Sequence, residues 1–512
     1  MFPGDVDTLG ADRPAIVMTG SGATRTWGEL NERSIRLANY WHERGIDVGG
    51  HVALLMENVI EFAEVCWAAE RSGRYYTPIN SHLTSTEVAY IIENCGARAV
   101  ITTTRLWPVL REALASLSVD VDVLCVGETD DVASYEEAIA NADSVVRFTE
   151  TAGQTMLYSS GTTGVPKGVW RPLSGRHPGD VVGIGLAIQM MWEGSPAMRY
   201  LSTAPLYHSA PMSFLLGTHR CGGTVYVMER FDATAACRAL ETYEITHSQW
   251  VPTMLSRMVQ LDESFRSQLR LEAHRFAIHG AAPCPVPLKR AVLDWWGPIL
   301  WEYYAGTEGP GSTVISPTEW LAHPGSVGRA SAGTLHIVGE DGEELPAGEV
   351  GTVYFESVAA TTFRYHGDDD KTESVRTSRG WSTMGDIGYL DDDGYLYLTD
   401  RKAFTIITGG VNVYPQEAEN VLVGHPDIRD VAVFGIPDSD LGEVAHAVVQ
   451  LRDGIEASLE KSNEILVFCQ SHLSRIKCPR TLSFVPSLNR AETGKLSKAQ
   501  LREDYLASLA SE

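Results

Sequence analysis

With 512 residues, the chain exceeds one ordinary hydrophobic core, and we expect it to fold into several domains or subdomains. Its 44% apolar and 21% charged residues are typical of a soluble globular protein. The formal net charge of −25 argues against nucleic acid or an anionic membrane surface as a partner, because both require basic patches. A small anionic substrate remains open, since a few local basic groups can bind one.

Neither a targeting segment nor a membrane span is expected. Residues 1–7 lack a basic run followed by an apolar one, and the longest apolar stretch, residues 181–192, is too short to cross a bilayer. The eight cysteines are scattered without a Cys-x-x-Cys pair, which favours reduced thiols over a zinc or dithiol site. We therefore expect a cytoplasmic protein, either a monomer or a homodimer.

Helices and strands alternate through the first part of the chain. A capping-box spacing from Thr26 to Glu29 predicts the start of a helix, which Gly45 is suited to end. The expected strands are residues 51–56, 75–79, 98–102, 198–204, 224–227, 246–251 and 275–279, and further helices are expected at residues 59–71, 85–95 and 181–192. This alternation implies βαβ units around parallel sheets.

The character of the sequence changes at residue 333. Short strands at 335–338, 350–355 and 394–398, separated by acidic turns, predict a mainly β subdomain over residues 333–400. Beyond it, a helix at 415–422, strands at 430–434 and 444–451, a helix at 459–473 and a strand at 481–485 predict a compact α+β unit. We thus expect a large domain of residues 1–400 and a small domain of residues 401–512.

The most informative segment is a loop of small and hydroxyl residues after the strand-like run 154–158. It contains Ser159, Ser160, Gly161, Thr162, Thr163, Gly164 and Lys167. Backbone N–H groups, hydroxyls and an ammonium group are what a polyphosphate requires. A Walker loop has Ser or Thr after its Gly-Lys pair and leads into a helix, whereas here Pro166 and Gly168 flank Lys167 and disfavour one. We predict a nucleotide loop of another kind, with an ordinary hairpin turn as the alternative.

Four further polar turns are weak signals when taken singly. They are residues 303–309, 382–386 with 400–402, 408–415, and 489–498. A tyrosine beside a small-residue turn can stack on a base, a carboxylate after a glycine can accept from ribose hydroxyls, and Glu308 offers the hard oxygen that Mg²⁺ prefers. Each segment also has an ordinary interpretation as a turn or as a solvated lysine.

Together and in this order, the motifs resemble the acyl-adenylate-forming superfamily, which includes acyl-CoA synthetases, firefly-luciferase-like enzymes and nonribosomal adenylation domains. The resemblance runs from Thr26 to Lys495, and within the superfamily the chain looks most like the actinobacterial fatty- and steroid-acid CoA ligases. It implies an α/β fold: a large N-terminal domain with parallel α/β sheets and a β subdomain, followed by a small mobile α+β domain that carries the catalytic lysine.

The resemblance also implies a site, residue by residue. The ATP-binding positions correspond to Ser159, Ser160, Gly161, Thr162, Thr163, Gly164 and Lys167 for the β- and γ-phosphates, Gly280, Ala281, Ala282 and Tyr304 for adenine, and Asp386 and Arg401 for ribose. The catalytic positions correspond to Thr307 at the α-phosphate, Glu308 on Mg²⁺, Lys495 between the substrate carboxylate and the α-phosphate, and His208 as a gate beside the acyl pocket.

The acid pocket is expected to be lined by Tyr207, His208, Trp250, His279, Gly280 and Tyr303, and the pantetheine tunnel by Gly409 and Gly410. Aromatic and histidine side chains favour a cyclic or aryl acid over a slim long chain. Two departures from the family pattern are visible: Ala403 and Phe404 stand where charged hinge residues are usual, and Ala305 replaces the glycine after Tyr304. A small residue can still absorb a hinge rotation.

The resemblance implies ATP-dependent activation of a carboxylic acid through an acyl-adenylate, with release of pyrophosphate and transfer to the thiol of coenzyme A. Two anions must meet in this reaction, so Mg²⁺ and lysine are needed to neutralise charge. Transfer to an amine, which forms an amide, is the main alternative because adenylation motifs are common to both reactions. A relative without catalysis is a third, disfavoured by the presence of Lys167, Glu308, Asp386 and Lys495.

Overall fold

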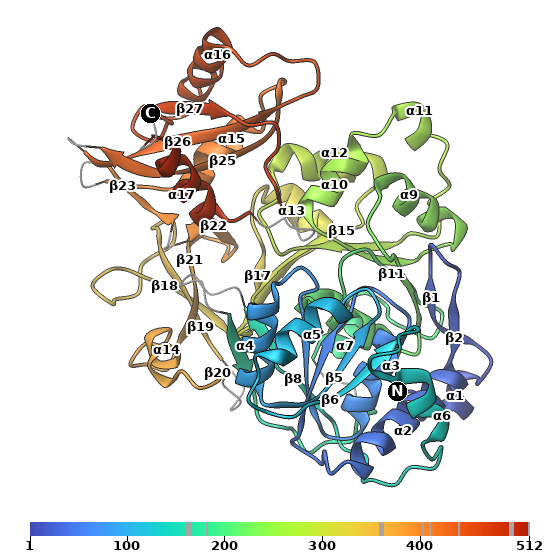
Figure 1. Cartoon of the computed structure of the whole chain (residues 1–512). Coiled ribbons are helices and arrows are strands. Elements are labelled where there is room, and N and C mark those ends of the chain that lie inside the picture. Colours follow the sequence, from blue (N-terminus) through green and yellow to red (C-terminus); the bar gives the residue numbers. More distant parts are fainter. Residues whose placement is uncertain are drawn as a thin grey trace.

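The computed structural model describes residues 1–159, 166–180, 183–357, 363–401, 404–408, 411–438, 441–490 and 496–509, with Arg401 described in its backbone only (Figure 1). In Figure 1 the orange-to-red C-terminal part forms a lobe of its own beside the larger N-terminal part. None of the helices in the described ranges combines the length and apolar character needed to cross a membrane.

The first layer is a six-stranded parallel sheet in the order β7-β6-β5-β3-β4-β8. Its strands are β3 (His51–Leu55), β4 (Tyr75–Ile79), β5 (Ala97–Thr103), β6 (Asp122–Val126), β7 (Ala133–Ser134) and β8 (Gln154–Thr155). The helices of this region are α1 (Val6–Leu9), α2 (Trp27–Glu43), α3 (Glu61–Arg71), α4 (Ser85–Cys95), α5 (Trp107–Ala115) and α6 (Tyr135–Asn141). The predicted capping box is confirmed at the start of α2, where Thr26 Oγ1 accepts from the N–H of Glu29 at 3.2 Å.

A nine-stranded sheet forms the second layer, in the order β17-β16-β15-β14-β13-β11-β12-β1-β2. The strands are β1 (Pro14–Met18), β2 (Thr24–Thr26), β11 (Arg199–Ser202), β12 (Thr224–Val227), β13 (His247–Trp250), β14 (Phe276–His279), β15 (Leu300–Ala305), β16 (Ser312–Ile315) and β17 (Arg329–Ala332). The helices are α7 (Ile184–Met191), α8 (Ser209–Arg220), α9 (Ala233–Thr242), α10 (Pro252–Val259), α11 (Glu263–Arg266), α12 (Val286–Trp296) and α13 (Pro317–Ala322). From β1 to β15 all neighbours are parallel, so the carboxyl ends of β13, β14 and β15 meet at one edge.

Two smaller sheets follow the parallel ones. The first is antiparallel, in the order β20-β10-β9, with β9 (Leu157–Ser159), β10 (Lys167–Trp170) and β20 (Arg364–Tyr365). The second, also antiparallel, is β18 (Thr334–Val338), β19 (Gly351–Glu356), β21 (Ser382–Leu390) and β22 (Leu396–Arg401). Helix α14 (Asp369–Ser374) lies between β20 and β21 in the chain.

The C-terminal part builds a sheet of β24 (Val411–Val413), β23 (Ile406–Thr408), β26 (Gly442–Leu451) and β25 (Ile428–Asp438), and β27 (Thr481–Phe484) pairs with β26. Its helices are α15 (Pro415–Leu422), α16 (Leu459–Gln470) and α17 (Lys498–Leu509). The chain passes from one sheet to another between β22, which ends at Arg401, and β23, which begins at Ile406. We propose the domain boundary at this point.

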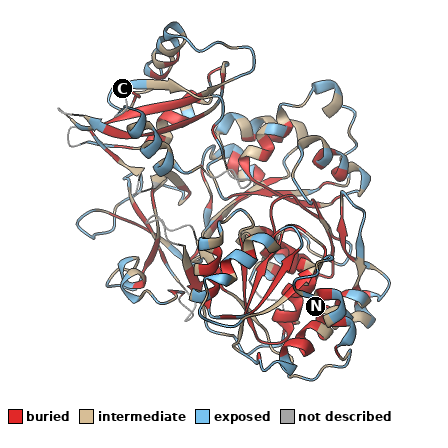
Figure 2. Ribbon diagram, in the orientation of Figure 1, coloured by how far each residue is buried: buried red, intermediate tan, exposed pale blue. Residues whose placement is uncertain are grey.

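Buried residues gather on the sheets and the helix faces that cover them (Figure 2). One apolar cluster joins both parallel sheets, with Leu54 of β3 and Val225 of β12 among its members. A separate cluster, which includes Ile406 of β23 and Ile465 of α16, fills the C-terminal part. The predicted fold class is confirmed: a large N-terminal part with parallel α/β sheets and a β subdomain, then a small α+β part.

Candidate active site

A cavity of about 1380 Å³ opens at the carboxyl ends of β13, β14 and β15. Residues of β4, β9, β10, β19, β20, β21 and α14 also line it, so four sheets contribute to its wall. Ligands of open α/β sheets bind at this edge of the strands. Of the predicted site residues, the wall contains Ser159, Lys167, Tyr207, His208, Trp250, Ala281, Tyr303, Tyr304, Thr307, Glu308 and Asp386.

Lys167 begins β10 and pairs with Ser159 of β9 in an antiparallel hairpin. Lys167 lies on the cavity wall, and its ammonium Nζ is 3.2 Å from Oδ2 of Asp368. A backbone hydrogen bond from Lys371, together with the Lys167 ammonium, holds the pKa of the Asp368 carboxyl below its usual value. A cation is thus positioned where the hairpin enters the cavity. The connecting residues Ser160, Gly161, Thr162, Thr163 and Gly164 lie outside the described residues.

The turn that carries Thr307 and Glu308 is held from two sides. Nη2 of Arg171 donates to the carbonyl oxygen of Thr307 at 2.9 Å and to that of Glu308 at 2.5 Å. The hydroxyl of Tyr365 donates to Oε1 of Glu308 at 3.0 Å. The carboxylate of Glu308 therefore has a fixed orientation on the cavity wall, and its hard oxygens suit Mg²⁺.

Tyr304 and Asp386 meet across the cavity wall from β15 and β21. The Tyr304 hydroxyl donates to Oδ2 of Asp386 at 2.6 Å, and Asp386 is only 6% exposed. Gly385 has a φ of +81°, a left-handed conformation that glycine adopts without strain, and the turn places Asp386 in the wall. The backbone of Asp386 pairs with that of Arg401, whose side chain is outside the described residues.

The Gly280-Ala281-Ala282 segment follows β14. A Cβ on Gly280 would lie 2.6 Å from a ring carbon of Tyr303, so only glycine allows this close packing. Ala281 lines the cavity with a φ of +69°, which is strained for a residue with a Cβ. Gly280 and Ala282 are not part of the cavity wall.

Part of the cavity wall is apolar. Helix α7 contributes Ala187 and Met191, and α8 contributes Phe214. His208 is the residue before α8, and its ring centroid lies 4.4 Å from that of Tyr207. The predicted acid-pocket residues Tyr207, His208, Trp250 and Tyr303 line this cavity too, whereas Gly409 and Gly410 lie outside the described residues.

His279 does not line the cavity, and this part of the prediction is corrected. It is fully buried at the end of β14, where its Nε2 lies 3.4 Å from Oε2 of Glu302, which Nζ of Lys289 also contacts at 2.6 Å. Burial lowers the pKa of His279, and although burial alone would raise the pKa of Glu302, the facing side chains of His279 and Lys289 hold it at about 2. Strand alternation turns His279 toward this ion pair.

Four residues of the cavity region escaped the sequence analysis. Arg171 directly follows β10, and its charge near the glycine loop was a usable signal. Tyr365 and Asp368 lie in a Tyr-His-Gly-Asp turn that combines an aromatic ring and a carboxylate, as the recognised motifs do. Gln249 gave no signal beyond being a polar residue in a buried strand.

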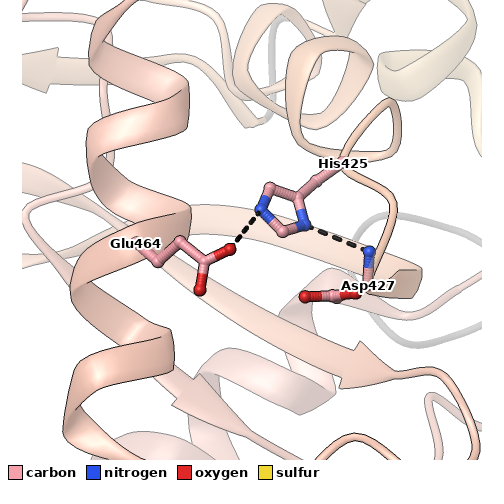
Figure 3. Close-up of side chains that lie close together, drawn as sticks. All are labelled: His425, Asp427 and Glu464. Atoms are coloured by element: carbon pink, nitrogen blue, oxygen red, sulfur yellow. Dashed lines mark hydrogen bonds and ion pairs between the residues drawn. The ribbon is translucent and has the colours of Figure 1, made fainter.

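His425, Asp427 and Glu464 form a group with metal-ligand spacing in the C-terminal part (Figure 3). Nζ of Lys461 already lies 2.6 Å from both carboxylates. The N–H of Asp427 donates to Nδ1 of His425 at 3.2 Å, so Nε2 carries the proton and faces Glu464 at 3.6 Å. The group is therefore arranged as an ion-pair network around a lysine.

Comparisons with known proteins point to one family. Residues 6–363 match the AMP-binding enzyme family, and residues 417–495 match the AMP-binding enzyme C-terminal domain, a range that includes Lys495, which lies outside the described residues. A long-chain-fatty-acid–CoA ligase of Mycobacterium tuberculosis is 30% identical over 97% of this chain and 96% of its own length. A 2-succinylbenzoate–CoA ligase of Geobacillus kaustophilus is 30% identical over 95% and 94%.

Among solved structures, an amide bond synthetase from Marinactinospora thermotolerans has a TM-score of 0.82 and 26% identity, covering 98% of this chain and 99% of that one. The N-terminal match spans both parallel sheets and β9 to β17, and the second match begins within α15, in the small C-terminal part. These full-length matches, together with the cavity that holds the motif residues, show that the chain belongs to the AMP-binding enzyme family and is an adenylate-forming enzyme.

Proposed function

We propose that this enzyme joins a carboxylic acid to coenzyme A through an acyl-adenylate. The observation that supports this best is a single cavity whose wall combines charged and apolar side chains. The wall presents the charged side chains of Lys167, Glu308 and Asp386, and it also presents the rings of Tyr207 and Trp250. A nucleotide and an apolar acid would thus meet in one space, which is what attack of a carboxylate on a phosphate requires.

The charged residues of the wall each have a defined part in the proposed reaction. Lys167 binds the departing pyrophosphate, and Asp386, oriented by Tyr304, binds the ribose hydroxyls. Glu308, oriented by Tyr365, is the ligand for Mg²⁺, which supplies positive charge at the phosphates when bound. The carboxylate oxygen attacks the α-phosphorus, the bond to pyrophosphate breaks, and the thiol then attacks the acyl carbon and releases AMP.

Coenzyme A is the proposed acceptor because the full-length relatives at 30% identity are named as CoA ligases. The likeness to an amide bond synthetase keeps an amine as the second candidate acceptor. Because both acceptors would react with an adenylate formed in the same cavity, an activity assay is needed to distinguish coenzyme A from an amine.

The test is incubation of the protein with ATP, Mg²⁺ and a panel of carboxylic acids, with either coenzyme A or amines, followed by mass spectrometry. We expect AMP, pyrophosphate and an acyl-CoA. AMP with an amide but no acyl-CoA would replace the proposed acceptor by an amine. No adenylate with any acid in the panel would contradict the proposal as a whole.

Lys495 is proposed, from the resemblance alone, to bridge the carboxylate and the α-phosphate. Lys495→Ala should therefore abolish acid-dependent adenylate formation while the melting temperature stays unchanged. If the variant formed the adenylate at the wild-type rate, Lys495 would have no part in the mechanism. The assignment of the cavity as the active site would be unaffected.

A further inference from the structure

Three side chains form a directed chain of hydrogen bonds that ends at the cavity. The Tyr200 hydroxyl donates to Oε1 of Gln249 at 3.2 Å, and Nε2 of Gln249 donates to the Tyr303 hydroxyl oxygen at 3.2 Å. Tyr200 is 1% exposed and Gln249 6%, and both Gln249 and Tyr303 line the cavity. Tyr303 uses its oxygen as an acceptor, and its own hydroxyl hydrogen has no acceptor in the part of the chain that the structure describes.

This hydrogen stays on the oxygen under ordinary conditions. Burial raises the pKa of Tyr303 to about 12, so the hydroxyl is neutral and remains a donor at neutral pH. The ring is held in place because it packs on Gly280, where no Cβ intervenes. The donor is therefore fixed in position before any ligand arrives.

The Tyr303 hydroxyl group is a polar donor among apolar neighbours. Its ring packs against an apolar cluster that includes Trp192, Phe214 and Ile278, and the Phe214 centroid lies 6.4 Å away. Ala187 and Met191 of α7 continue the apolar wall. An apolar ligand without an acceptor removes water from this donor and leaves it without a hydrogen bond, which destabilises the complex. A ligand that supplies an acceptor restores the hydrogen bond.

We propose that Tyr303, oriented by Gln249, selects acids that carry a hydrogen-bond acceptor, such as a ring carbonyl, hydroxyl or ether oxygen, on an otherwise apolar body. The inference rests on the proposed acid activation and names the substrate class of the same site. A site built around a buried polar group discriminates against the analogue that lacks the matching group. Plain alkyl and unsubstituted cyclic acids should therefore be poorer substrates than their oxygenated counterparts.

The experiment compares matched pairs of acids, for example 3-cyclohexylpropanoate with 3-(4-oxocyclohexyl)propanoate and 3-phenylpropanoate with 3-(4-hydroxyphenyl)propanoate. Acid-dependent pyrophosphate release gives kcat/KM for each member. For at least one pair, the wild type should prefer the oxygenated acid by about 10-fold or more. Tyr303→Phe should lower kcat/KM for the oxygenated acid more than for the unsubstituted one, and so remove most of this preference, while the KM for ATP stays unchanged.

Gln249→Leu is the second variant, because it leaves the Tyr303 hydroxyl in place and removes only the group that orients it; it should weaken the preference as well. Tyr226→Phe, which removes a hydroxyl from a tyrosine outside the cavity that packs on Tyr243, is the matched control.

An equal loss of kcat/KM for both acids of a pair in Tyr303→Phe, or an unchanged preference in both variants, would overturn the inference. Failure of the wild type to activate any acid would instead overturn the proposed function, and this inference with it.

Discussion

Glu308 and Asp386, the carboxylates proposed to bind Mg²⁺ and ribose, each accept a hydrogen bond from a tyrosine on another strand. Tyr365 orients Glu308 at 3.0 Å, and Tyr304 orients Asp386 at 2.6 Å. Fixed orientation reduces the reorganisation needed when a ligand binds. At the residue scale, the directions of these two carboxylates are therefore set by neutral tyrosine hydroxyls.

Lys167 offers a direct test of the proposed phosphate contact. Lys167→Met keeps the length of the side chain and removes its charge, so a charge-assisted contact with polyphosphate is lost. We expect kcat/KM for ATP to fall by about 10- to 100-fold, in line with roughly 1.5–3 kcal/mol for such a contact. Steady-state kinetics with ATP varied at saturating acid measures this change.

Lys461→Met is the matched control, because Lys461 pairs with Asp427 and Glu464 outside the cavity. Its kcat/KM for ATP should stay within about twofold of the wild type, as expected for an ion pair remote from the substrate. If Lys167→Met behaved like the control, Lys167 would have no part in binding ATP.

Single residues were predictable where their chemistry is concentrated in a short motif. Lys167, Glu308 and Asp386 line the cavity, and each lies beside a glycine in a compact polar turn that can be recognised in the sequence. Asp368, the partner of Lys167, lies 201 residues further along the chain, and no local pattern links the two. His279 was misplaced because a motif does not show which face of its strand a side chain occupies.

At the scale of elements, Gly280 and β15 are packed too closely for any other residue. A Cβ on Gly280 would lie 2.6 Å from a ring carbon of Tyr303 and 2.9 Å from its backbone oxygen. Gly280→Ala should therefore lower the free energy of unfolding by about 1–3 kcal/mol, a typical cost of overpacking. Urea denaturation measures the change. Gly424→Ala, where the nearest atom is 3.1 Å away, is the control, and an equal effect in both would contradict this reading of the packing.

Buried histidines on α8, on β13 and in the loop before β14 predict an acid-sensitive fold. Burial lowers the pKa of His219 and of His247 to about 4 and that of His274 to about 3. His219 is held neutral because its Nδ1 accepts from the indole N–H of Trp67 at 2.9 Å while its Nε2 donates to the carbonyl oxygen of Ala15 at 3.0 Å.

The unfolded chain takes up protons on these rings near pH 6.5, whereas the native state does so only near pH 4 or below. Stability should therefore fall as the pH drops from about 6.5 toward 4, by about 1.4 kcal/mol per pH unit for each such histidine. Melting temperatures from pH 7.5 to pH 5 check this, and His219→Gln should flatten the slope. A melting temperature that does not change over this range would contradict the assignment of these rings as neutral and buried.

Several elements with a buried apolar face are predicted with their observed bounds, whereas two elements without one are not predicted. The predicted bounds of β4, α4, β12 and α15 agree with the structure, because their apolar residues repeat at the spacing of the element. Helix α17 was missed because it has no buried residue, and β17 because all of its residues are exposed. Tertiary contacts, and not local pattern, decide such segments.

At the scale of the whole molecule, the cavity is assembled from segments that are far apart in the sequence. Lys167 of β10, Glu308 after β15 and Asp386 of β21 meet only because three sheets come together around one space. The alternation of helices and strands predicted parallel sheets, but not how the sheets face one another. The part of the cavity wall proposed to bind the acid, which includes residues of α7, α8 and β13 to β15, was predictable only in part for the same reason.

The proposed reaction begins with attack of the carboxylate on the α-phosphate, and isotope transfer tests this step most directly. An acid labelled with ¹⁸O in its carboxylate is incubated with the enzyme, ATP, Mg²⁺ and coenzyme A, and the phosphate-containing products are weighed by mass spectrometry. Because the bridging oxygen of the acyl-adenylate comes from the acid, the account predicts one ¹⁸O atom in AMP and none in pyrophosphate. Label in inorganic phosphate, with ADP as the other product, would place the attack at the γ-phosphate and contradict it.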